Sequence, residues 1–499
     1  MKTQIVIIGA GPTGLMLANQ LQRLGIEFKI LDTKTGPTNQ SRALAVSARS
    51  MELYQQLGLA AVVSEQSTEV KGFEIFQNGK TKASVNLENL GKGLSDFPNF
   101  MNAFEQSKNE KLLADRLLQN GQEILWNHEF ISFEEQTDSI IVSVKDMRNG
   151  QVLEIETTYL VGCEGARSPV RHQLDLSFDG GTYENKFFVV DTKIDWDLPY
   201  DKVILAPTDF QFITFFPLKG KKNMRVIGTL PRSFNDQEDI DIEKLEKIIQ
   251  EVTKIRIDFL DRGWNSIYKL HHRSVKQFSK GRVFLAGDAA HIHSPAGGQG
   301  MNTGLQDAHN LAWKLAFVLK NFASEKLLET YNEERLPIAK QLLKSTDSGF
   351  TFLAGDHFFV RTIRKALLIP IISNLLRISR FRTFAFKKIS QIDYSYEKQS
   401  LSQSYTQQKL TFKAGDRLPF IEDNFFENFK EPVFHLICIS NNKLPDPSDF
   451  SYPVIVKQLP FSEKWKEMGV VSELYIMVRP DQHILWISDK ISDKLFHLV

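Results

Sequence analysis

Near the N-terminus, short apolar runs alternate with a helical stripe. The continuous apolar run Ile5–Ile8 ends at a glycine, which is typical of a buried parallel strand. Pro12–Leu24 follows with apolar residues on one helical stripe, and Gly25 ends it. Phe28–Leu31 is apolar again. This order predicts a strand–helix–strand unit, the building block of a parallel sheet.

The pattern changes between residues 175 and 270, where short apolar segments alternate with turns. This spacing predicts an antiparallel sheet inserted into the first domain, with strands at Lys186–Ile194, Lys202–Ala206, Gln211–Phe216 and Met224–Thr229. Buried-strand patterns also occur at Thr158–Val161 and Gly281–Gly287. The remaining helices are expected at Ser47–Leu57, Glu105–Gln119, Met301–Leu319 and through most of Phe322–Arg380, and a short α/β pattern fills Phe412–Val499.

Composition excludes several classes of protein. The 499 residues include 61 basic and 60 acidic side chains, so the chain lacks the basic footprint of a nucleic-acid binder. Only Cys163 and Cys438 are present, which excludes a disulfide framework and zinc spacing, and no metal site is expected. The apolar run Ala366–Ile378 contains Pro370 and is too short for a membrane span. No targeting segment is recognised, so we expect a cytoplasmic protein with no membrane span.

The first chemical motif is the glycine-rich turn Gly9–Gly14, between the first strand and its helix. Gly9 would make the turn, Gly11 would let a pyrophosphate approach the backbone, and Gly14 would let helix and strand pack closely. The helix N-terminus offers unpaired N–H groups to phosphates. Asp32 ends the second strand, where a carboxylate accepts hydrogen bonds from ribose hydroxyls. Together these features predict a bound dinucleotide.

A second motif, Gly287–His291, ends a later strand and precedes the glycine-rich helix start Pro295–Asn302. The helix dipole there favours negative charge, and a reduced flavin is anionic around N1 and O2, so an isoalloxazine fits. The alternative is that Asp288 is a buried residue that caps the helix turn. His291 and His293 are either proton shuttles or polar packing residues.

The third motif, Gly162–Arg171, also follows a strand. Its glycines, serine and arginines are suited to holding a pyrophosphate transiently. The alternative is a turn whose arginines make surface ion pairs.

In this order the three motifs resemble the class A flavoprotein aromatic hydroxylases, the para-hydroxybenzoate hydroxylase-like and phenol 2-monooxygenase-like FAD monooxygenases. The run Gly281–Lys314 looks like that family almost throughout. The resemblance implies an α/β fold: a Rossmann-like FAD-binding domain with an inserted antiparallel β-sheet substrate domain, a helical connection and a small C-terminal thioredoxin-like α/β domain. We expect the FAD-binding domain at 1–174 and 271–393, the last part including the helical segment, the substrate domain at 175–270 and the C-terminal domain at 394–499.

The resemblance also implies roles for single residues. Glu164 stands where the family has an aspartate, and its extra methylene shifts the carboxylate by about 1.5 Å. The residues expected to bind FAD are Gly9, Gly11, Pro12, Thr13, Gly14 and Asp32 (ADP part), Arg42 (pyrophosphate and flavin), Gln106, Glu164, Asp288 (ribityl chain), and Pro295, Gly298, Gln299, Gly300, Met301 and Asn302 (flavin ring). Those expected to take part in catalysis are Arg42, Pro295 and Gly298.

The implied activity is that of an FAD-dependent monooxygenase. NADPH or NADH would bind only transiently, because no second strand–GxGxxG–helix unit is present. O2, the co-substrate, would form a flavin 4a-hydroperoxide whose distal oxygen passes to a phenolic or polycyclic aromatic ring. Alternatives are a Baeyer–Villiger-type oxygenation, oxidative inactivation of an aromatic antibiotic, and, in another class, a non-oxygenating flavoprotein oxidase or an FAD- and ligand-binding module. Monomer and homodimer both stay open.

Phenylalanines are abundant and divide between the predicted domains. Strand alternation predicts that Phe212 and Phe216, with Arg225 on the next strand, line the substrate site. Phe425, Phe426, Phe429 and Phe434 are expected in the core of the C-terminal domain. That domain has no CxxC pair, which excludes thioredoxin-type dithiol chemistry and leaves a packing or assembly role.

Overall fold

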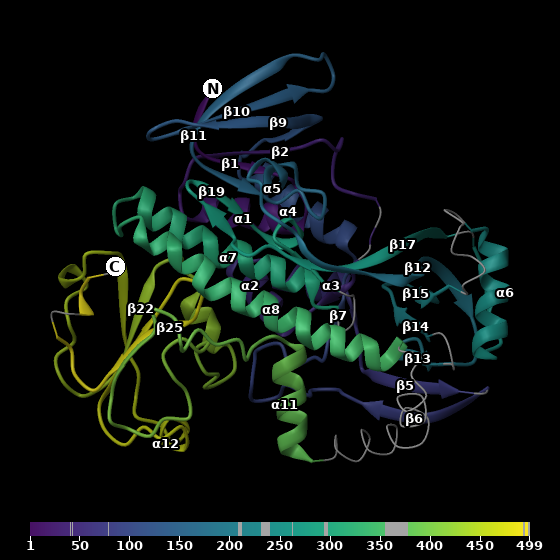
Figure 1. Cartoon of the computed structure of the whole chain (residues 1–499). Helices are drawn as coiled ribbons and strands as arrows, with labels where there is room; N and C mark the ends of the chain where they lie inside the picture. The colour runs from purple at the N-terminus through teal and green to yellow at the C-terminus, as the bar shows by residue number, and fades with distance from the viewer. Residues whose placement is uncertain are drawn as a thin grey trace.

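The computed structural model describes residues 1–39, 41, 43–77, 79–207, 212–230, 240–261, 263–293, 298–354, 378–492 and 495–497. It confirms the parallel unit at the N-terminus, formed by β1 (Lys2–Ile8), α1 (Pro12–Arg23) and β2 (Phe28–Asp32) (Figure 1). The continuous apolar runs form central strands because both faces of the sheet are covered. Within the described ranges, no helix is both long and apolar enough to cross a membrane.

This first sheet has the order β18–β19–β11–β1–β2–β8, and β9 and β10 extend β11 as an antiparallel ribbon (Figure 1). Parallel pairing of β1 with β11 and of β11 with β19 aligns the ends of the strands that carry the three motifs. Helix α1 packs on α4 (Gln106–Gln119) and α7 (Gly300–Leu319). The other strands are β8 (Ile124–Trp126), β9 (His128–Glu135), β10 (Ile140–Asp146), β11 (Val152–Gly162), β18 (Ser279–Lys280) and β19 (Val283–Leu285).

The predicted inserted sheet is present, and its path through the described residues is β20–β17–β12–β15–β14–β13–β5–β6. The hairpin of β5 and β6 comes from within residues 1–174 and pairs in parallel with β13, which the sequence analysis did not foresee. Its strands are β5 (Gly72–Gln77), β6 (Lys80–Asn86), β12 (Asp179–Asp195), β13 (Val203–Pro207), β14 (Phe212–Pro217), β15 (Asn223–Thr229), β17 (Trp264–Ser274) and β20 (His291–Ile292), with β16 (Asp258–Phe259) beside β12. Helix α6 (Ile242–Thr253) covers one face with an apolar core of its own.

The remaining elements are short strands and helices outside the two large sheets. The strands β3 (Ala45–Val46), β7 (Asn102–Ala103) and β4 (Thr68–Glu69) form a small sheet of their own in the order β3–β7–β4, and α2 (Ala48–Gln56) packs on α7. The other helices are α3 (Ala60–Gln66), α5 (Pro169–Gln173), η2 (Gly287–Ala289), α8 (Lys326–Ala354) and α11 (Ser379–Ile389).

The C-terminal region forms a five-stranded sheet among the described residues, in the order β21–β25–β24–β22–β23. Pairing is parallel between β22 and β23 and antiparallel between β22 and β24. The elements are β21 (Gln403–Tyr405), β22 (Phe434–Ile439), β23 (Val454–Gln458), β24 (Leu474–Val478) and β25 (Ile484–Ser488), with η3 (Phe425–Phe429), η4 (Pro447–Asp449) and α12 (Glu463–Glu467). The thioredoxin-like relationship and the four domain boundaries stay predictions.

The four phenylalanines that were expected in the C-terminal core do not all pack in the same place. Phe425, Phe426 and Phe429 lie in the C-terminal core as expected. Phe434, in contrast, lies in a core shared by the FAD-binding and C-terminal regions, and its ring contacts Trp313 and Phe317 of α7 at centroid distances of 5.6 and 5.3 Å. Its ring also packs on Tyr452 of the C-terminal region at 4.7 Å, so Phe434 lies where the C-terminal sheet docks on α7.

Candidate functional site

The first motif forms a tight turn between β1 and α1. Gly9 has φ +100°, and a Cβ there would lie 2.6 Å from the backbone of Cys163. A Cβ on Gly14 would lie 1.9 Å from the carbonyl oxygen of Gly9, so only glycine lets α1 come this close to the turn. A Cβ on Gly11 would meet no protein atom within 4 Å. The space beside Gly11 is therefore open.

The N-terminus of α1 faces this space without a side-chain cap. Gly11 is the N-cap residue, Pro12 occupies the first turn, and no side chain accepts a hydrogen bond from the first N–H groups. Free N–H groups at a helix N-terminus attract anions. An uncapped helix beside a glycine with open space thus fits a pyrophosphate, as the sequence predicts.

Asp32 lies at the end of β2, beside the same turn. One of its carboxylate oxygens accepts a hydrogen bond from the N–H of Ala10 at 2.7 Å, and the other accepts one from the N–H of Lys34 at 2.9 Å. The Lys34 ammonium lies 3.6 Å from Asp32 and 2.9 Å from Glu110. Because an ionised carboxylate offers about four acceptor positions, Asp32 can still bind ribose hydroxyls.

Thr13 brings the first and second motifs together. A Cβ on Gly287 would lie 2.5 Å from the Thr13 hydroxyl, and a Cβ on Gly304 would lie 2.4 Å from it. Thr13 therefore fits between η2 and α7 only because both neighbours are glycines. Asp288 is exposed, although its neighbours Gly287 and Ala289 are buried. The exposed carboxylate disagrees with the alternative of a buried capping aspartate.

The start of α7 is tied to β3 and α2. The Asn302 amide donates to the carbonyls of Ala45 (2.9 Å) and Gly298 (2.8 Å), and its oxygen accepts from the Ser47 N–H and the Ser50 hydroxyl. All its hydrogen-bonding capacity is used, so the Asn302 side chain holds this loop in place. Gly298 has φ +63°, and a Cβ there would lie 2.6 Å from the Cβ of Ala45.

Other residues at this end are placed as follows. Gln299 is the N-cap of α7, and Gly300 begins the helix, with the His293 ring 3.1 Å from the position of its absent Cβ. Met301 is half-buried and its sulfur accepts from Asn109. Arg42 and Pro295, which the sequence analysis places in catalysis, lie outside the described residues.

Gln106 begins α4 and holds the loop before β3. Its backbone N–H donates to the Ser41 hydroxyl at 2.8 Å, and its side-chain oxygen accepts from the N–H of Ala43 at 3.3 Å. The amide nitrogen donates to Glu110 at 3.0 Å. Gln106 thus ties Ser41 and Ala43 to the start of α4.

In the third motif, the Glu164 carboxylate caps the start of α5. It accepts hydrogen bonds from the Ser168 hydroxyl at 3.0 Å and the Val170 N–H at 3.2 Å. Burial raises the pKa of Glu164 to about 7, although these hydrogen bonds and Arg171 oppose the shift. Burial therefore favours the protonated carboxyl of Glu164 more than solvent would.

Arg171 fits neither of the two interpretations of the third motif. It is buried, and its guanidinium donates to the carbonyls of Ala289 (3.0 Å) and Ala166 (2.8 Å) and lies over the Phe178 ring. A surface ion pair is therefore wrong for Arg171. Its contact with Ala289 joins the third motif to the second.

The three predicted substrate contacts have different surroundings. Phe216 is half-buried in an apolar cluster that also contains Leu44, Ala45 and Phe100, and Ala45 touches Gly298. The side chain of Phe212 lies outside the described residues. Phe216 thus lies on the side of the sheet that approaches the second motif.

Arg225 is completely buried and bonded within the protein. Its guanidinium forms a bidentate pair with Asp191 at 2.7 and 2.6 Å and donates to the Ala43 carbonyl at 3.1 Å. These bonds anchor the inserted sheet to the loop after position 42. Substrate contact by Arg225 stays a prediction, and the structure gives its charge a different partner.

The sequence analysis missed a buried network behind the second motif. The Asp307 carboxylate accepts hydrogen bonds from the Gly287 N–H (3.2 Å) and from Arg335 (2.7 Å). It also pairs with the His291 ring at 2.7 Å. His291 is buried, stacks on Phe278 and bonds to Asp307; its two interpretations, proton shuttle and packing residue, stay predictions. A signal was available: on the apolar helix α7, polar residues recur with helical spacing at Asn302, Thr303, Gln306, Asp307, Asn310 and Lys314.

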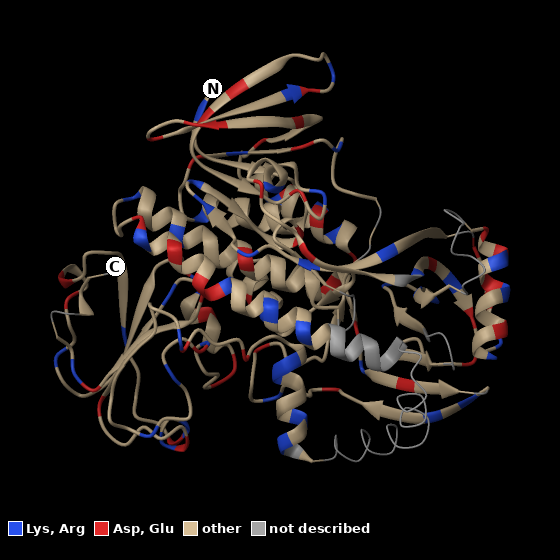
Figure 2. Cartoon of the chain, viewed as in Figure 1, with Lys and Arg blue, Asp and Glu red and all other residues tan. Residues whose placement is uncertain are grey.

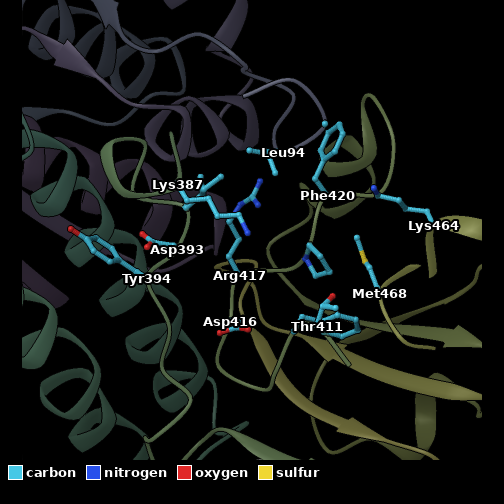
Figure 3. Close-up of a pocket in the computed structure, with 14 residues that line it drawn as sticks. Leu94, Lys387, Asp393, Tyr394, Thr411, Asp416, Arg417, Phe420, Lys464 and Met468 are labelled. Atoms are coloured by element: carbon cyan, nitrogen blue, oxygen red, sulfur yellow. The ribbon is translucent and has the colours of Figure 1, made fainter. Parts of the chain in front are cut away.

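A separate cleft of about 300 Å³ lies where α11 and the segment after it face the C-terminal domain (Figure 3). Helix α11 carries several basic residues (Figure 2), and one of them, Lys387, lines the cleft. Arg417 in the cleft pairs with the buried Glu52 of α2. The lining residues are Gly93, Leu94, Lys387, Ile392, Asp393, Tyr394, Thr411, Phe412, Asp416, Arg417, Pro419, Phe420, Lys464 and Met468, and none of them is a predicted site residue.

Comparison with known proteins agrees with this geometry. The model of a family described as FAD binding domain matches residues 2–346. The chain is 30% identical over 431 residues to the pentachlorophenol 4-monooxygenase of Sphingobium chlorophenolicum, covering 84% of this chain and 76% of the relative. It is 33% identical over 351 residues to the 6-methylpretetramide 4-monooxygenase of Streptomyces rimosus, covering 70% of this chain but only 62% of that relative.

Among solved structures, the anhydrotetracycline hydroxylase OxyS from Streptomyces rimosus superposes with a TM-score of 0.74 and 27% identity, covering 98% of this chain and 96% of the other. The similarity therefore extends through the C-terminal region. These findings confirm the predicted fold class and support FAD as the cofactor.

Proposed function

The chain belongs to the FAD-binding-domain family of flavin-dependent monooxygenases, and we propose that it is an FAD-dependent monooxygenase that takes electrons from NADPH or NADH and hydroxylates an aromatic substrate. The observation that carries this proposal is the open space at Gly11, at the uncapped end of α1, where Thr13 joins the first motif to the second. Such a site can hold an extended dinucleotide.

The residues would divide the cofactor between them. The N–H groups at the start of α1 would bind the pyrophosphate, and Asp32 the adenosine ribose. The exposed Asp288 would hold ribityl hydroxyls, and the backbone of 298–302 would lie along the flavin ring. When bound, FAD supplies the acceptor for the electrons of NAD(P)H and the site at which O2 is activated.

The apolar cluster between the two sheets is the proposed wall of the substrate site. Leu44, Ala45, Met101 and Ala103 are buried in it, and Phe100 and Phe216 are half-buried. An apolar wall excludes water from the reaction and suits an aromatic ring. Two relatives named above point to the substrate class, since their names specify a chlorinated phenol and a polycyclic intermediate.

The experiment is a substrate panel with the purified full chain. The yellow flavin spectrum is recorded first, after addition of FAD. Oxidation of NADPH and of NADH is then followed with phenols and polycyclic aromatics, and with cyclohexanol as a non-aromatic control similar in size to phenol. We expect at least one aromatic compound, but not cyclohexanol, to accelerate oxidation above background. A chain that takes up no FAD contradicts the proposal.

Product analysis separates this proposal from the alternatives. Insertion of oxygen into a ring bond to give an ester or lactone would identify a Baeyer–Villiger-type reaction. Oxidation of substrate with all oxygen recovered as peroxide would identify an oxidase. A cytoplasmic location and a monomeric or homodimeric state stay predictions, to be tested by fractionation and by light scattering.

A further inference from the structure

Part of the polar stripe of α7 finds its hydrogen-bond partners in the last part of the chain, since Gln391 bonds to Thr303 and Gln306 and Asp481 bonds to Asn310. Helix α7 begins at the second motif, and its residues Asn302, Thr303, Gln306, Asp307 and Asn310 are all buried. In Figure 1 the helix lies between the FAD-binding sheet and the C-terminal domain. A buried polar group needs a partner, so whatever supplies these partners fixes the position of the helix.

The first such partner is Gln391, directly after α11. Its amide nitrogen donates to the Thr303 hydroxyl at 3.0 Å and lies 3.5 Å from the Gln299 carbonyl, and its oxygen accepts from Gln306 at 2.7 Å. Gln391 is 1% exposed. One side chain thus contacts the N-cap residue and the first two turns of α7, the end that is proposed to face the flavin.

The second partner is Tyr396, which acts through Arg335 of α8. Arg335 donates to the Tyr396 hydroxyl at 2.9 Å, to Asp307 at 2.7 Å and to the Thr303 carbonyl at 3.3 Å. Asp307 in turn accepts from the N–H of Gly287, next to Asp288. The Tyr396 hydroxyl is therefore connected to the second motif by one arginine and one aspartate, all of them buried.

The third contact is a cluster of buried charges from the C-terminal sheet. Arg479 pairs with Glu334 of α8 at 2.6 Å and with Asp481 at 2.5 Å. Asp481 also accepts from Trp313 of α7 at 3.2 Å. On the other side, Arg49 of α2 donates to the Asp481 carbonyl. Buried charges thus join the C-terminal domain to α2, α7 and α8. Moving this domain away from the helices would leave these charges buried without their partners, which costs free energy.

We propose that Gln391 and Tyr396 are positioning residues for FAD, which hold the start of α7 in place relative to the second motif. Through them, the segment after α11 sets the affinity for FAD and the coupling of NAD(P)H oxidation to oxygenation. This inference rests on the proposed function. Neither residue touches the space at Gly11, so their effect passes through Thr303, Arg335 and Asp307. It gives the segment that follows α11 a role in positioning FAD.

Two variants test the proposal in the full-length chain. Tyr396→Phe removes only the hydroxyl that Arg335 contacts. Gln391→Asn shortens the amide by one methylene, and asparagine tolerates the positive φ of 61° at this position. The matched control is Tyr452→Phe, which removes another buried tyrosine hydroxyl whose partner, the Leu495 carbonyl, lies within the C-terminal domain.

The measurements are the Kd for FAD on reconstitution of the apoprotein, the visible flavin spectrum, the thermal unfolding midpoint, and the fraction of oxidised NAD(P)H that yields product. We expect Tyr396→Phe and Gln391→Asn to raise the Kd for FAD about five- to tenfold, as for one lost hydrogen bond. Their flavin spectra should shift and their coupling fall, while Tyr452→Phe keeps the wild-type values.

Each other outcome is decisive. Wild-type Kd, spectrum and coupling in both test variants overturn the inference, even if the unfolding midpoint falls. An equal loss of FAD affinity in the control overturns it too, because the effect is then general destabilisation. A wild-type chain that binds no FAD refutes the proposed function itself, and is recognised before any variant is compared.

Discussion

Two neighbouring glycines of the first motif should respond oppositely to the same substitution. Gly11→Ala adds a methyl group to an open space, with backbone angles of −84° and −176° that alanine adopts readily. Gly14→Ala places its Cβ 1.9 Å from the Gly9 carbonyl oxygen. We therefore expect Gly11→Ala to fold normally and bind FAD poorly, and Gly14→Ala to be destabilised even without FAD.

The magnitudes follow from these contacts. Gly11→Ala should change the free energy of unfolding of the apoprotein by less than about 1 kcal/mol, with a stabilising sign, because alanine restricts the unfolded chain. A pyrophosphate displaced by the new methyl loses at least one charge-assisted hydrogen bond of about 1.5–3 kcal/mol, which corresponds to a Kd raised about 10- to 150-fold. Gly14→Ala should lose about 1–3 kcal/mol by overpacking.

Urea unfolding of the apoproteins and fluorescence titration with FAD measure both quantities. The two variants serve as controls for each other, since each adds one methyl group to the same turn. Wild-type FAD affinity in Gly11→Ala would refute the reasoning, because the open space would then not be the place where the cofactor approaches.

Three further predictions concern other parts of the site. Burial raises the pKa of Glu164 from 4.5 to about 7, so the native state binds this proton more tightly than the unfolded state does. The free energy of unfolding, measured by urea titration, should therefore fall as the pH rises from 4.5 to about 7, and Glu164→Gln should flatten that fall. Arg479→Met leaves two buried carboxylates short of their partner and should lower the free energy of unfolding by about 3–5 kcal/mol; a loss below 1 kcal/mol would contradict the buried network. Phe216→Ala should raise KM for the aromatic substrate several-fold or uncouple NADPH oxidation from product, whereas unchanged KM and coupling would remove Phe216 from the site.

Local chemistry was predictable from the sequence where a motif and its strand or helix are contiguous. Gly9, Gly11 and Gly14 lie in the predicted turn because their spacing fits one strand–helix connection. The helical and alternating periods also located α1, α4, α7 and most strands of the inserted sheet. The hairpin of β5 and β6 was missed because strand pairing between distant segments leaves no periodic signal.

The partners of buried polar residues were not predictable. The sequence analysis considered pyrophosphate or surface roles for Arg171, expected Arg225 at the substrate from strand alternation, and placed Asn302 by family resemblance, and none of these patterns contains the residue's bonding partner. In the structure these three side chains donate to the carbonyls of Ala289, Ala43 and Ala45, groups far away in the sequence. The contact of Phe434 with Trp313 was missed for the same reason, since it depends on how the C-terminal sheet docks.

The central claim, that the chain is an aromatic monooxygenase, is tested most directly by the origin of oxygen in the product. The full chain with FAD, NAD(P)H and the best aromatic compound of the panel is incubated under ¹⁸O2, and the product is analysed by mass spectrometry. The account predicts a ring-hydroxylated product that carries one ¹⁸O atom. A product without ¹⁸O, with all the consumed oxygen recovered as hydrogen peroxide, would contradict it.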